Sequence, residues 1–245
     1  MKVVITGANG FVGKNLIAHL NERKDIEVIS FTRDNTIVEL PSIVAEADFV
    51  FHLAGVNRPQ SPEEFKIDNA DLTLALCEAI KLSGRQVPIL YTSSTQADQD
   101  NPYGVSKLAA ERLLQDLQAS HGSSIYVLRL PNVFGKWARP AYNSAVATFC
   151  HNITRDLPIQ INDRQARISL VYIDDVIEYF IGVMDAGSAA DPTVRLHPVY
   201  NITVGELADQ LNSFRESRAT LVSDAVGEGL VRALYSTYVA CLWKC

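Results

Sequence analysis

The sequence contains no run of eighteen consecutive apolar residues, and this absence argues against a transmembrane helix. A secretory signal peptide is not predicted either, because Met1 leads into a short apolar run followed by glycines. The cysteines are few, dispersed and without CxxC spacing, which argues against a disulfide framework or a zinc site. They are Cys77, Cys150, Cys241 and Cys245. We therefore expect a cytoplasmic protein with reduced thiols.

The sequence also contains fewer basic than acidic residues and few histidines. The chain has 22 Lys and Arg residues against 28 Asp and Glu residues, and the net charge of −6 argues against nucleic acid or an anionic membrane as the main partner. The 5 histidines do not cluster as metal ligands do, so we expect no metal. With 245 residues, 47% of them hydrophobic, the chain is long enough for one large α/β domain.

Short apolar segments alternate with longer segments of helical periodicity. Strands are expected at Lys2–Thr6, Ile26–Phe31, Asp48–Leu53, Pro88–Ser93 and Ser124–Leu130. Helices are expected over 11–20, 62–82 and 103–119. Continuous apolar strands separated by helices indicate a parallel sheet that is covered on both faces. Right-handed crossovers then predict a Rossmann-type, doubly wound α/β fold.

The pattern becomes less regular after Leu130. We expect a loop over 131–143, a helix over 144–155, and a strand followed by a helix that begins near Asp174. The segment TVGE has the spacing of a capping box and predicts another helix start at Thr203. The last segment, from Glu228, is expected to be helical.

The segment TGANGFVG, Thr6–Gly13, follows the first predicted strand and opens a helix. Gly7 permits a tight turn, Gly10 lets the backbone approach a pyrophosphate, and Gly13 allows close packing of the helix. The free N–H groups and the positive dipole end of that helix suit phosphates. The segment predicts a dinucleotide-binding loop, although a plain strand-to-helix turn has similar composition.

The end of the second predicted strand reads SFTRD and bears on the choice of dinucleotide. An NAD site usually has an acidic residue here, which binds the ribose 2′-OH. Thr32 and Arg33 come first, and a guanidinium suits a 2′-phosphate through bidentate hydrogen bonds. NADP(H) is therefore favoured. The alternative is that Arg33 is a solvated loop charge and that Asp34 binds the ribose.

Tyr103 and Lys107 are four residues apart and face the same side of a predicted helix. A phenol has a pKa near 10 in isolation, and a neighbouring ammonium lowers that pKa. Tyr103 could then exchange a proton with a substrate carbonyl or hydroxyl, while Ser94 hydrogen-bonds the same oxygen. YxxxK pairs also occur by chance at exposed helix starts. The preceding glycine loop and strand end favour the catalytic interpretation.

The ordered motifs TGxxGxxG, DFVFHLAG, a serine cluster and YxxxK resemble those of the extended short-chain dehydrogenase/reductase family, the NAD-dependent epimerase/dehydratases, which act largely on nucleotide sugars. The resemblance implies a catalytic triad of Ser94, Tyr103 and Lys107, with Ser93 or Thr95 as the hydroxyl if the register differs by one. Lys107 would also hold the nicotinamide ribose. The other implied cofactor-binding residues are Gly7, Asn9, Gly10, Phe11, Val12, Gly13, Thr32, Arg33, Leu53, Ala54, Gly55, Asn69 and Tyr103.

The segments AGVNRP, TQADQDNPYGVSK, PNVFGKW and YNSAVATFCHNI resemble more closely the NADPH-dependent reductases of bacterial capsule and O-antigen synthesis. These reduce the 4-keto group of a UDP-linked 2-acetamido-2,6-dideoxy-hexos-4-ulose on the way to N-acetyl-L-fucosamine. The resemblance implies that Tyr103 protonates the developing alkoxide. The implied substrate-binding residues are Arg58, Ser94, Asn132, Lys136, Arg139 and Arg167. An ordinary surface charge is the alternative for each of the basic ones.

Three other activities compete with this interpretation. A nucleotide-sugar 4-epimerase uses the same triad but retains NAD, and Arg33 argues against NAD. A 4,6-dehydratase usually has an acidic pair after the catalytic hydroxyl, where this chain has Thr95 and Gln96. A non-catalytic NADP-binding sensor would not need the intact triad.

The resemblance also bears on domains and partners. We predict an NADP-binding core over 1–130 and a mainly substrate-binding portion over 131–245. The similar reductases carry a C-terminal cupin domain that epimerises the sugar, which we expect this chain to lack. Either the chain is a truncated product or it works with a separate epimerase. Family members often form homodimers through two helices, one of which carries YxxxK. Leu108, Leu113, Leu114 and Leu117 could serve that interface or the core.

Overall fold

The structure is a computed structural model that describes residues 1–57, 61, 65–187 and 196–242. The chain folds into two compact units. The first unit contains residues 1–130 and the part of helix α7 (Ile173–Ala186) that begins at Ile177. The second unit contains residues 131–176 and the chain from Leu196 onward.

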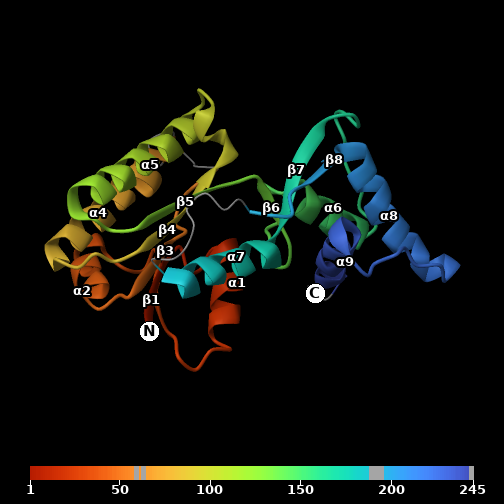
Figure 1. Ribbon diagram of the computed structural model, residues 1–245. Coiled ribbons are helices and arrows are strands. Elements are labelled where there is room, and N and C mark those ends of the chain that lie inside the picture. The colour runs from red at the N-terminus through yellow and green to blue at the C-terminus, as the bar shows by residue number, and fades with distance from the viewer. Residues whose placement is uncertain (58–60, 62–64, 188–195, 243–245) are drawn as a thin grey trace. The chain divides into compact units, whose positions relative to one another are not determined.

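A five-stranded parallel sheet forms the centre of the first unit (Figure 1). Its strands are β1 (Lys2–Thr6), β2 (Glu27–Phe31), β3 (Phe49–His52), β4 (Ile89–Ser94) and β5 (Ile125–Leu130), in the order β2-β1-β3-β4-β5. The order reverses between β1 and β3, and ligands bind beyond the carboxyl ends of the strands at such a switch point. The predicted doubly wound α/β fold is confirmed.

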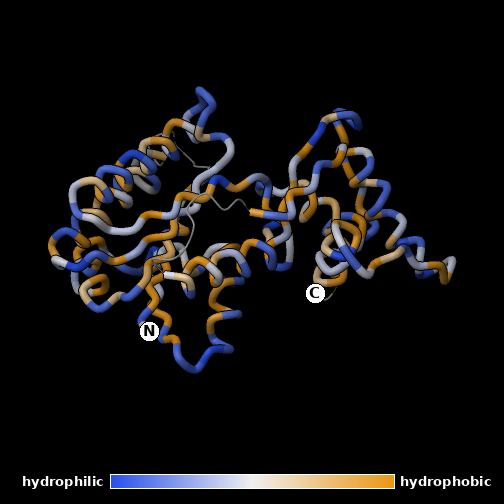
Figure 2. Tube along the Cα trace, in the orientation of Figure 1, coloured by the Kyte–Doolittle hydropathy of each residue, from blue (hydrophilic) through white to orange (hydrophobic). Residues whose placement is uncertain are grey.

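Helices cover both faces of this sheet. Helices α2 (Leu40–Ala45), α4 (Leu72–Ser83) and α5 (Pro102–His121) lie on one face, and α1 (Phe11–Leu20) and α7 lie on the other (Figure 1). The central strands are buried on both sides, and Figure 2 shows them as mainly hydrophobic while the helices mix hydrophobic and hydrophilic turns. This two-sided burial explains why the strands read as continuous apolar segments rather than as alternating ones.

Successive strand residues point to opposite layers of the core. Val50 and Tyr91 belong to the cluster under α2, α4 and α5, together with Leu114 of α5. Phe51 points the other way, and its ring stacks on that of Phe180 in α7 at a centroid distance of 5.7 Å. Leu114 and Leu117 are fully buried, so the apolar face of α5 that they form serves the core.

The second unit has a three-stranded sheet and three helices. The strands are β6 (Asn132–Phe134), β7 (Arg167–Tyr172) and β8 (Tyr200–Thr203), and β7 pairs parallel with β6 and antiparallel with β8. The helices are α6 (Ala145–Ile153), α8 (Val204–Thr220) and α9 (Gly229–Leu242). The predicted capping box is confirmed, because the Glu206 backbone N–H donates to Thr203 Oγ1 and the Thr203 N–H donates to the Glu206 carboxylate.

Two local predictions differ from the structure, and two elements were not predicted. The expected loop over 131–143 contains strand β6, whose three residues are too few to show a strand pattern. The helix expected over 62–82 is α4, preceded by a π-helical segment at Lys66–Asp71, and residues 62–64 lie outside the described residues. Helix α2 and strand β8 were not predicted. In the described part of the chain, each helix is too short or too polar to cross a bilayer.

We expect Leu114→Ala to destabilise the first unit by about 2–5 kcal/mol, because the side chain is fully buried and its loss leaves a cavity. The matched control is Leu82→Ala on α4, whose side chain is 78% exposed and should change stability by no more than about 0.5 kcal/mol. Native-state hydrogen exchange of peptides from β1, β3 and β4 measures the opening free energy of this unit. Equal effects of the two substitutions would contradict the assignment of α5 to the core.

Candidate functional site

The glycine loop joins the end of β1 to the start of α1 and touches the end of β3. Gly7 adopts φ +71°, a left-handed conformation, and a Cβ atom there would lie 2.7 Å from the Ala54 backbone nitrogen. A Cβ on Gly13 would lie 2.5 Å from the Gly7 carbonyl oxygen, so Gly13 lets α1 pack against the loop itself. The predicted residues Gly7, Gly13 and Ala54 are therefore brought together by backbone contacts that exclude side chains.

The first turn of α1 offers backbone donors to an anion. Gly10 occupies the N-cap position with extended φ and ψ, and no side chain in the described residues caps the helix. The leading amides of α1 therefore lack helical partners and suit phosphate oxygens. Asn9 is exposed, and Phe11 and Val12 are half-buried. A loop that a Cβ would fill, followed by uncapped amides, fits the pyrophosphate of a dinucleotide.

Thr32, Arg33 and Asp34 lie directly beyond the end of β2. The Thr32 hydroxyl donates to the Asp34 carboxylate at 3.3 Å, and the Asp34 backbone N–H donates back to Thr32 Oγ1 at 3.2 Å. Arg33 and Asp34 are both exposed. This turn presents a cation and an anion side by side beyond the end of β2.

A chain of hydrogen bonds runs under the end of β3 through buried His52. Thr6 Oγ1 lies 2.7 Å from His52 Nδ1, and His52 Nε2 lies 2.9 Å from Thr73 Oγ1. Thr73 Oγ1 donates to the Asn69 carbonyl, so its oxygen must accept from His52 Nε2–H, and Nδ1 then accepts from Thr6. Burial lowers the pKa of His52 to about 3, so the ring stays neutral. Thr6 Oγ1 also accepts the Ala54 N–H, which fixes the segment after β3.

Asn69 is buried and connects three parts of the site. Its Oδ1 accepts from the Val56 N–H at 2.9 Å, and its Nδ2 donates to the Val56 carbonyl and to Ser106 Oγ. Ser106 in turn donates to the Tyr103 carbonyl. A Cβ on Gly55 would lie 2.8 Å from Asn69 Oδ1 and 2.9 Å from Lys107 Nζ. The structure thus brings Gly55, Asn69 and Lys107 together, with Leu53 and Ala54 in the same strand-end segment.

Ser94 ends β4, and Tyr103 lies in the first turn of α5. The Ser94 hydroxyl caps the 3₁₀ turn Thr95–Asp98 by accepting the Gln96 N–H at 3.1 Å. This turn folds back on α5, because a Cβ on Gly104 would lie 2.2 Å from the Gln96 carbonyl oxygen. Glycine after Tyr103 therefore allows the short connection between Ser94 and Tyr103 to pack against the helix start.

Lys107 is buried, with 5% of its surface exposed. Its Nζ donates to the Thr92 carbonyl at 2.9 Å and lies 4.9 Å from the centre of the Tyr91 ring. Burial lowers the pKa of Lys107 to about 8. An ammonium that is still charged at neutral pH, one helical turn from Tyr103, can favour the phenolate of that tyrosine.

Glu111 and Arg129 were not predicted from the sequence. Glu111 lies one turn beyond Lys107 on α5 and is buried, and Arg129 of β5 binds it. The spacing of Tyr103, Lys107 and Glu111 places them on one helix face, and this is the signal that could have identified Glu111. His52 could have been identified only from its place at the end of an apolar strand.

The remaining predicted substrate residues belong to the second unit, except Arg58, which lies outside the described residues. Asn132 Nδ2 donates to the Ser169 carbonyl, and Lys136 Nζ donates to Asp174 at 3.2 Å. The Arg139 guanidinium lies over the Tyr142 ring, and Arg167 is exposed at the start of β7. These contacts are with different neighbours and do not by themselves define one site.

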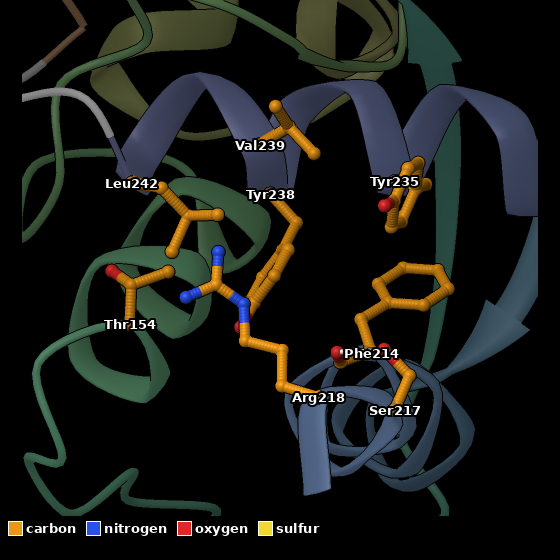
Figure 3. Close-up of a pocket in the computed structure, with 8 residues that line it drawn as sticks. All are labelled: Thr154, Phe214, Ser217, Arg218, Tyr235, Tyr238, Val239 and Leu242. Carbon is orange, nitrogen blue, oxygen red and sulfur yellow. Dashed lines mark hydrogen bonds between the residues drawn. The ribbon is translucent and has the colours of Figure 1, made fainter. Parts of the chain in front are cut away.

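A pocket of about 490 Å³ lies in the second unit, between α8, α9 and the end of α6 (Figure 3). Phe214 packs edge-on against Tyr235 with ring centroids 5.2 Å apart, and Figure 3 shows Arg218 extending from α8 alongside Tyr238. The lining residues are Thr154, Phe214, Ser217, Arg218, Tyr235, Tyr238, Val239 and Leu242. Within the described ranges, none of the predicted site residues lines it. No group of three metal-ligating side chains occurs in the same ranges.

The chain is similar over most of its length to proteins of one family. The model of the NAD dependent epimerase/dehydratase family matches residues 3–203. The UDP-2-acetamido-2,6-beta-L-arabino-hexul-4-ose reductase of Pseudomonas aeruginosa strain PA103 is 60% identical over 242 residues, which cover 99% of this chain and 65% of that protein.

Two solved structures extend the comparison. The capsular polysaccharide assembling protein CapF from Staphylococcus aureus has 40% sequence identity and a TM-score of 0.89, and the match covers 99% of this chain and 66% of that chain. UDP-glucuronic acid 4-epimerase from Bacillus cereus, in complex with NAD, has a TM-score of 0.83 at 18% identity, which shows a shared fold. This chain spans about two thirds of the length of the Pseudomonas and Staphylococcus proteins.

We expect the buried charge of Lys107 to give stability a specific dependence on pH. Its pKa is about 8 in the folded protein and 10.5 in the reference state, so between these values the unfolded chain holds the proton that the folded chain has lost. The unfolding free energy therefore rises with pH in this window, and the cost of the charge is fully present only below pH 8.

Urea unfolding followed by circular dichroism tests this, with Lys107→Met as the comparison. The unfolding free energy of the wild type should rise relative to that of Lys107→Met by about 2 kcal/mol between pH 8 and pH 10. Parallel curves for the two proteins would show that the folded protein does not perturb Lys107.

Proposed function

Because this chain belongs to the NAD-dependent epimerase/dehydratase family, we propose that it reduces the 4-keto group of a UDP-linked 2-acetamido-2,6-dideoxy-hexos-4-ulose with NADPH. The observation that carries this proposal is the high identity with the Pseudomonas reductase over nearly the whole of this chain. The proposal concerns the reduction step alone.

The cofactor would bind beyond the carboxyl ends of β1, β2 and β3. The amides of Phe11 and Val12 suit its pyrophosphate, while the Gly10 amide donates to the Gly7 carbonyl, and Gly7 and Gly13 keep that approach open. Thr32 and Arg33 suit the adenosine 2′-phosphate, which makes NADPH the proposed cofactor. Asn9, Leu53, Ala54, Gly55 and Asn69 complete the proposed site.

Proton transfer is assigned to α5 and the end of β4. When bound, NADPH supplies the hydride that reduces the C4 carbonyl. Tyr103 donates a proton to the resulting alkoxide, and Ser94 donates a hydrogen bond that positions the same oxygen. Lys107 stabilises the phenolate that Tyr103 becomes and also binds the nicotinamide ribose. The Thr92 carbonyl holds the Lys107 ammonium in place, so the charge is preorganised before substrate arrives.

The second unit would supply most contacts to the UDP-sugar. Asn132, Lys136, Arg139 and Arg167 are the proposed residues there, with Arg58 and Ser94 from the first part of the chain. Cations suit the diphosphate, because charge-assisted hydrogen bonds to phosphate are strong. We accordingly assign cofactor binding to residues 1–130 and substrate binding mainly to residues 131–245.

The same proposal bears on the cellular compartment of the reaction and on the partners of the protein. The reaction is placed in the cytoplasm, where dispersed cysteines stay reduced. Its substrate requires a preceding dehydration of a UDP-sugar and a separate epimerisation. Leu74 and Leu82 of α4 and Val105 of α5 are exposed apolar residues on the helices that would form a homodimer.

Tyr103→Phe should lower kcat for NADPH-dependent reduction of UDP-linked 4-keto-6-deoxy-HexNAc sugars by about 100- to 10,000-fold, because the proton donor is lost. NADPH oxidation is followed by absorbance, and NADPH binding by fluorescence confirms a folded site. The matched control is Tyr235→Phe in the pocket of the second unit. The reductase hypothesis fails if the wild-type chain binds NADPH but turns over none of these sugars.

Arg33→Ala should weaken NADPH binding by about 10- to 100-fold, because a charge-assisted pair with the 2′-phosphate is lost. NADH binding should change by less than about twofold, since NADH has no 2′-phosphate to lose. Titration calorimetry measures both, with Arg112→Ala on the exposed side of α5 as the control. Equal weakening of the two cofactors would refute the role of Arg33.

A further inference from the structure

Glu111 is a buried carboxylate with 3% of its surface exposed, and the proposed chemistry does not use it. It lies on α5 one turn beyond Lys107 and two turns beyond Tyr103, so the three side chains share one face of the helix. Buried carboxylates are rare unless they are paired, because removing the charge from water is costly. The hydrogen-bond partners of Glu111 therefore indicate the role of its carboxylate.

Both carboxylate oxygens of Glu111 are occupied. Oε1 accepts from the Ser93 hydroxyl and from Arg129 Nε at 2.9 Å, and Oε2 accepts from Arg129 Nη2 at 2.7 Å. The pair with Arg129 is a bidentate fork, the strongest geometry for a carboxylate and a guanidinium. Ser93 of β4 is also the register partner of Arg129 in β5, so Glu111 binds two adjacent strand ends at one point.

Arg129 extends the network to the connection between Ser94 and Tyr103. Its Nη1 donates to both oxygens of Asp98, at 2.7 and 2.8 Å, and Asp98 ends the 3₁₀ turn after Ser94. The Asp98 side chain is 73% exposed, so this outer pair is weak by itself. Its significance is geometric, because it joins the turn through Arg129 to the buried Glu111.

Three consecutive residues at the end of β4 are thereby tied to different neighbours. The Thr92 carbonyl accepts from Lys107, Ser93 donates to Glu111, and Ser94 caps the turn that Arg129 holds. Two of these contacts are one turn apart on α5 and dock that helix on the strand end in one register. The relative positions of the hydroxyl, phenol and ammonium groups follow from this docking.

We propose that Glu111, held by Arg129, is a positioning residue of the Ser94–Tyr103–Lys107 site. It orients α5 on the end of β4 and places a buried carboxylate on the helix face that carries Lys107. The first part of the role rests on the contacts alone, and the effect on turnover rests on the reductase function proposed above.

The charges around Lys107 are consistent with this role. The titratable groups that face it are His52 from β3, Tyr91 from β4 and Glu111 from α5 itself, and Tyr103 lies one turn before it on the same helix. His52 is neutral, and burial raises the pKa of Tyr91 well above its usual value, so neither supplies a negative charge. Burial lowers the pKa of Lys107, and Glu111 is the group that raises it.

Two substitutions with opposite expected signs test the proposal. Glu111→Gln removes the anion, so Lys107 should lose its proton about one pH unit lower than in the wild type. Arg129→Gln removes the guanidinium that neutralises the Glu111 carboxylate, so Lys107 should lose its proton at higher pH. The double variant with Gln at both positions keeps a hydrogen-bonded pair and should shift Lys107 in the same direction as Glu111→Gln by a smaller amount, because the Arg129 cation is also removed. The double variant replaces Glu111→Gln in the test if that single variant does not fold.

Lys107 is titrated directly by NMR of protein labelled with [ε-¹³C]lysine, and its signal is assigned from its loss in Lys107→Arg. The control is Asp116→Asn, which removes an exposed carboxylate from the same helix and should leave the titration unchanged. The alkaline limb of the kcat/KM profile with NADPH and the UDP-linked keto sugar should move with Lys107 in each variant, by the same amount and sign.

Opposite shifts in Glu111→Gln and Arg129→Gln, with none in Asp116→Asn, support the proposal. Titration curves of Lys107 that coincide in all variants overturn it. The same holds for shifts of one sign in both substitutions, which a purely structural ion pair would give. A wild-type protein that reduces no keto sugar yet shows the opposite shifts refutes the reductase function and leaves the positioning role of Glu111 intact.

Discussion

The burial of the Lys107 ammonium constrains the rest of the first unit. A charge that has been taken out of water needs hydrogen-bond acceptors and a compensating charge, and it needs them at fixed positions. The Thr92 carbonyl supplies the acceptor, and Glu111 lies one helical turn away as the opposite charge. Gly55 must lack a side chain, because a Cβ there would meet Lys107 Nζ. The Lys107 amine therefore constrains which residues can occupy the end of β4, the face of α5 and the segment after β3.

This constraint lies where the topology of the sheet makes room for it. The carboxyl ends of β1, β3 and β4 are adjacent, so the glycine loop, the Leu53–Gly55 segment and Ser94 meet at one edge without long connections. Gly7 and Ala54 touch through backbone atoms, and Gly104 lets the turn after Ser94 lie on the start of α5. The glycines do not make these loops flexible. They allow backbones to pack at distances that a Cβ would prevent.

The sequence was sufficient to predict the parallel sheet, because strands buried on both faces read as apolar runs with helices between them. It was also sufficient to place the glycine loop between β1 and α1, and Tyr103 and Lys107 one turn apart on α5. Strand β6 could not be predicted in this way, since its three residues form a strand only by pairing with β7, far along the chain. His52 and Arg129 were missed for a similar reason. Each is defined by partners on other elements, and local periodicity contains no information about those partners.

The hydrogen-bond chain through His52 has a further consequence. Thr6, His52 and Thr73 each donate one hydrogen to the next member, and the direction is set from both ends by the Ala54 N–H and the Asn69 carbonyl. No member can be replaced by an apolar residue without leaving a buried neighbour unpaired, and replacing all three together would still leave the Ala54 N–H without its acceptor. We therefore expect the three residues to be substituted together in evolution. Relatives that lack the set should therefore have another acceptor for the Ala54 N–H, and intermediate combinations should be rare.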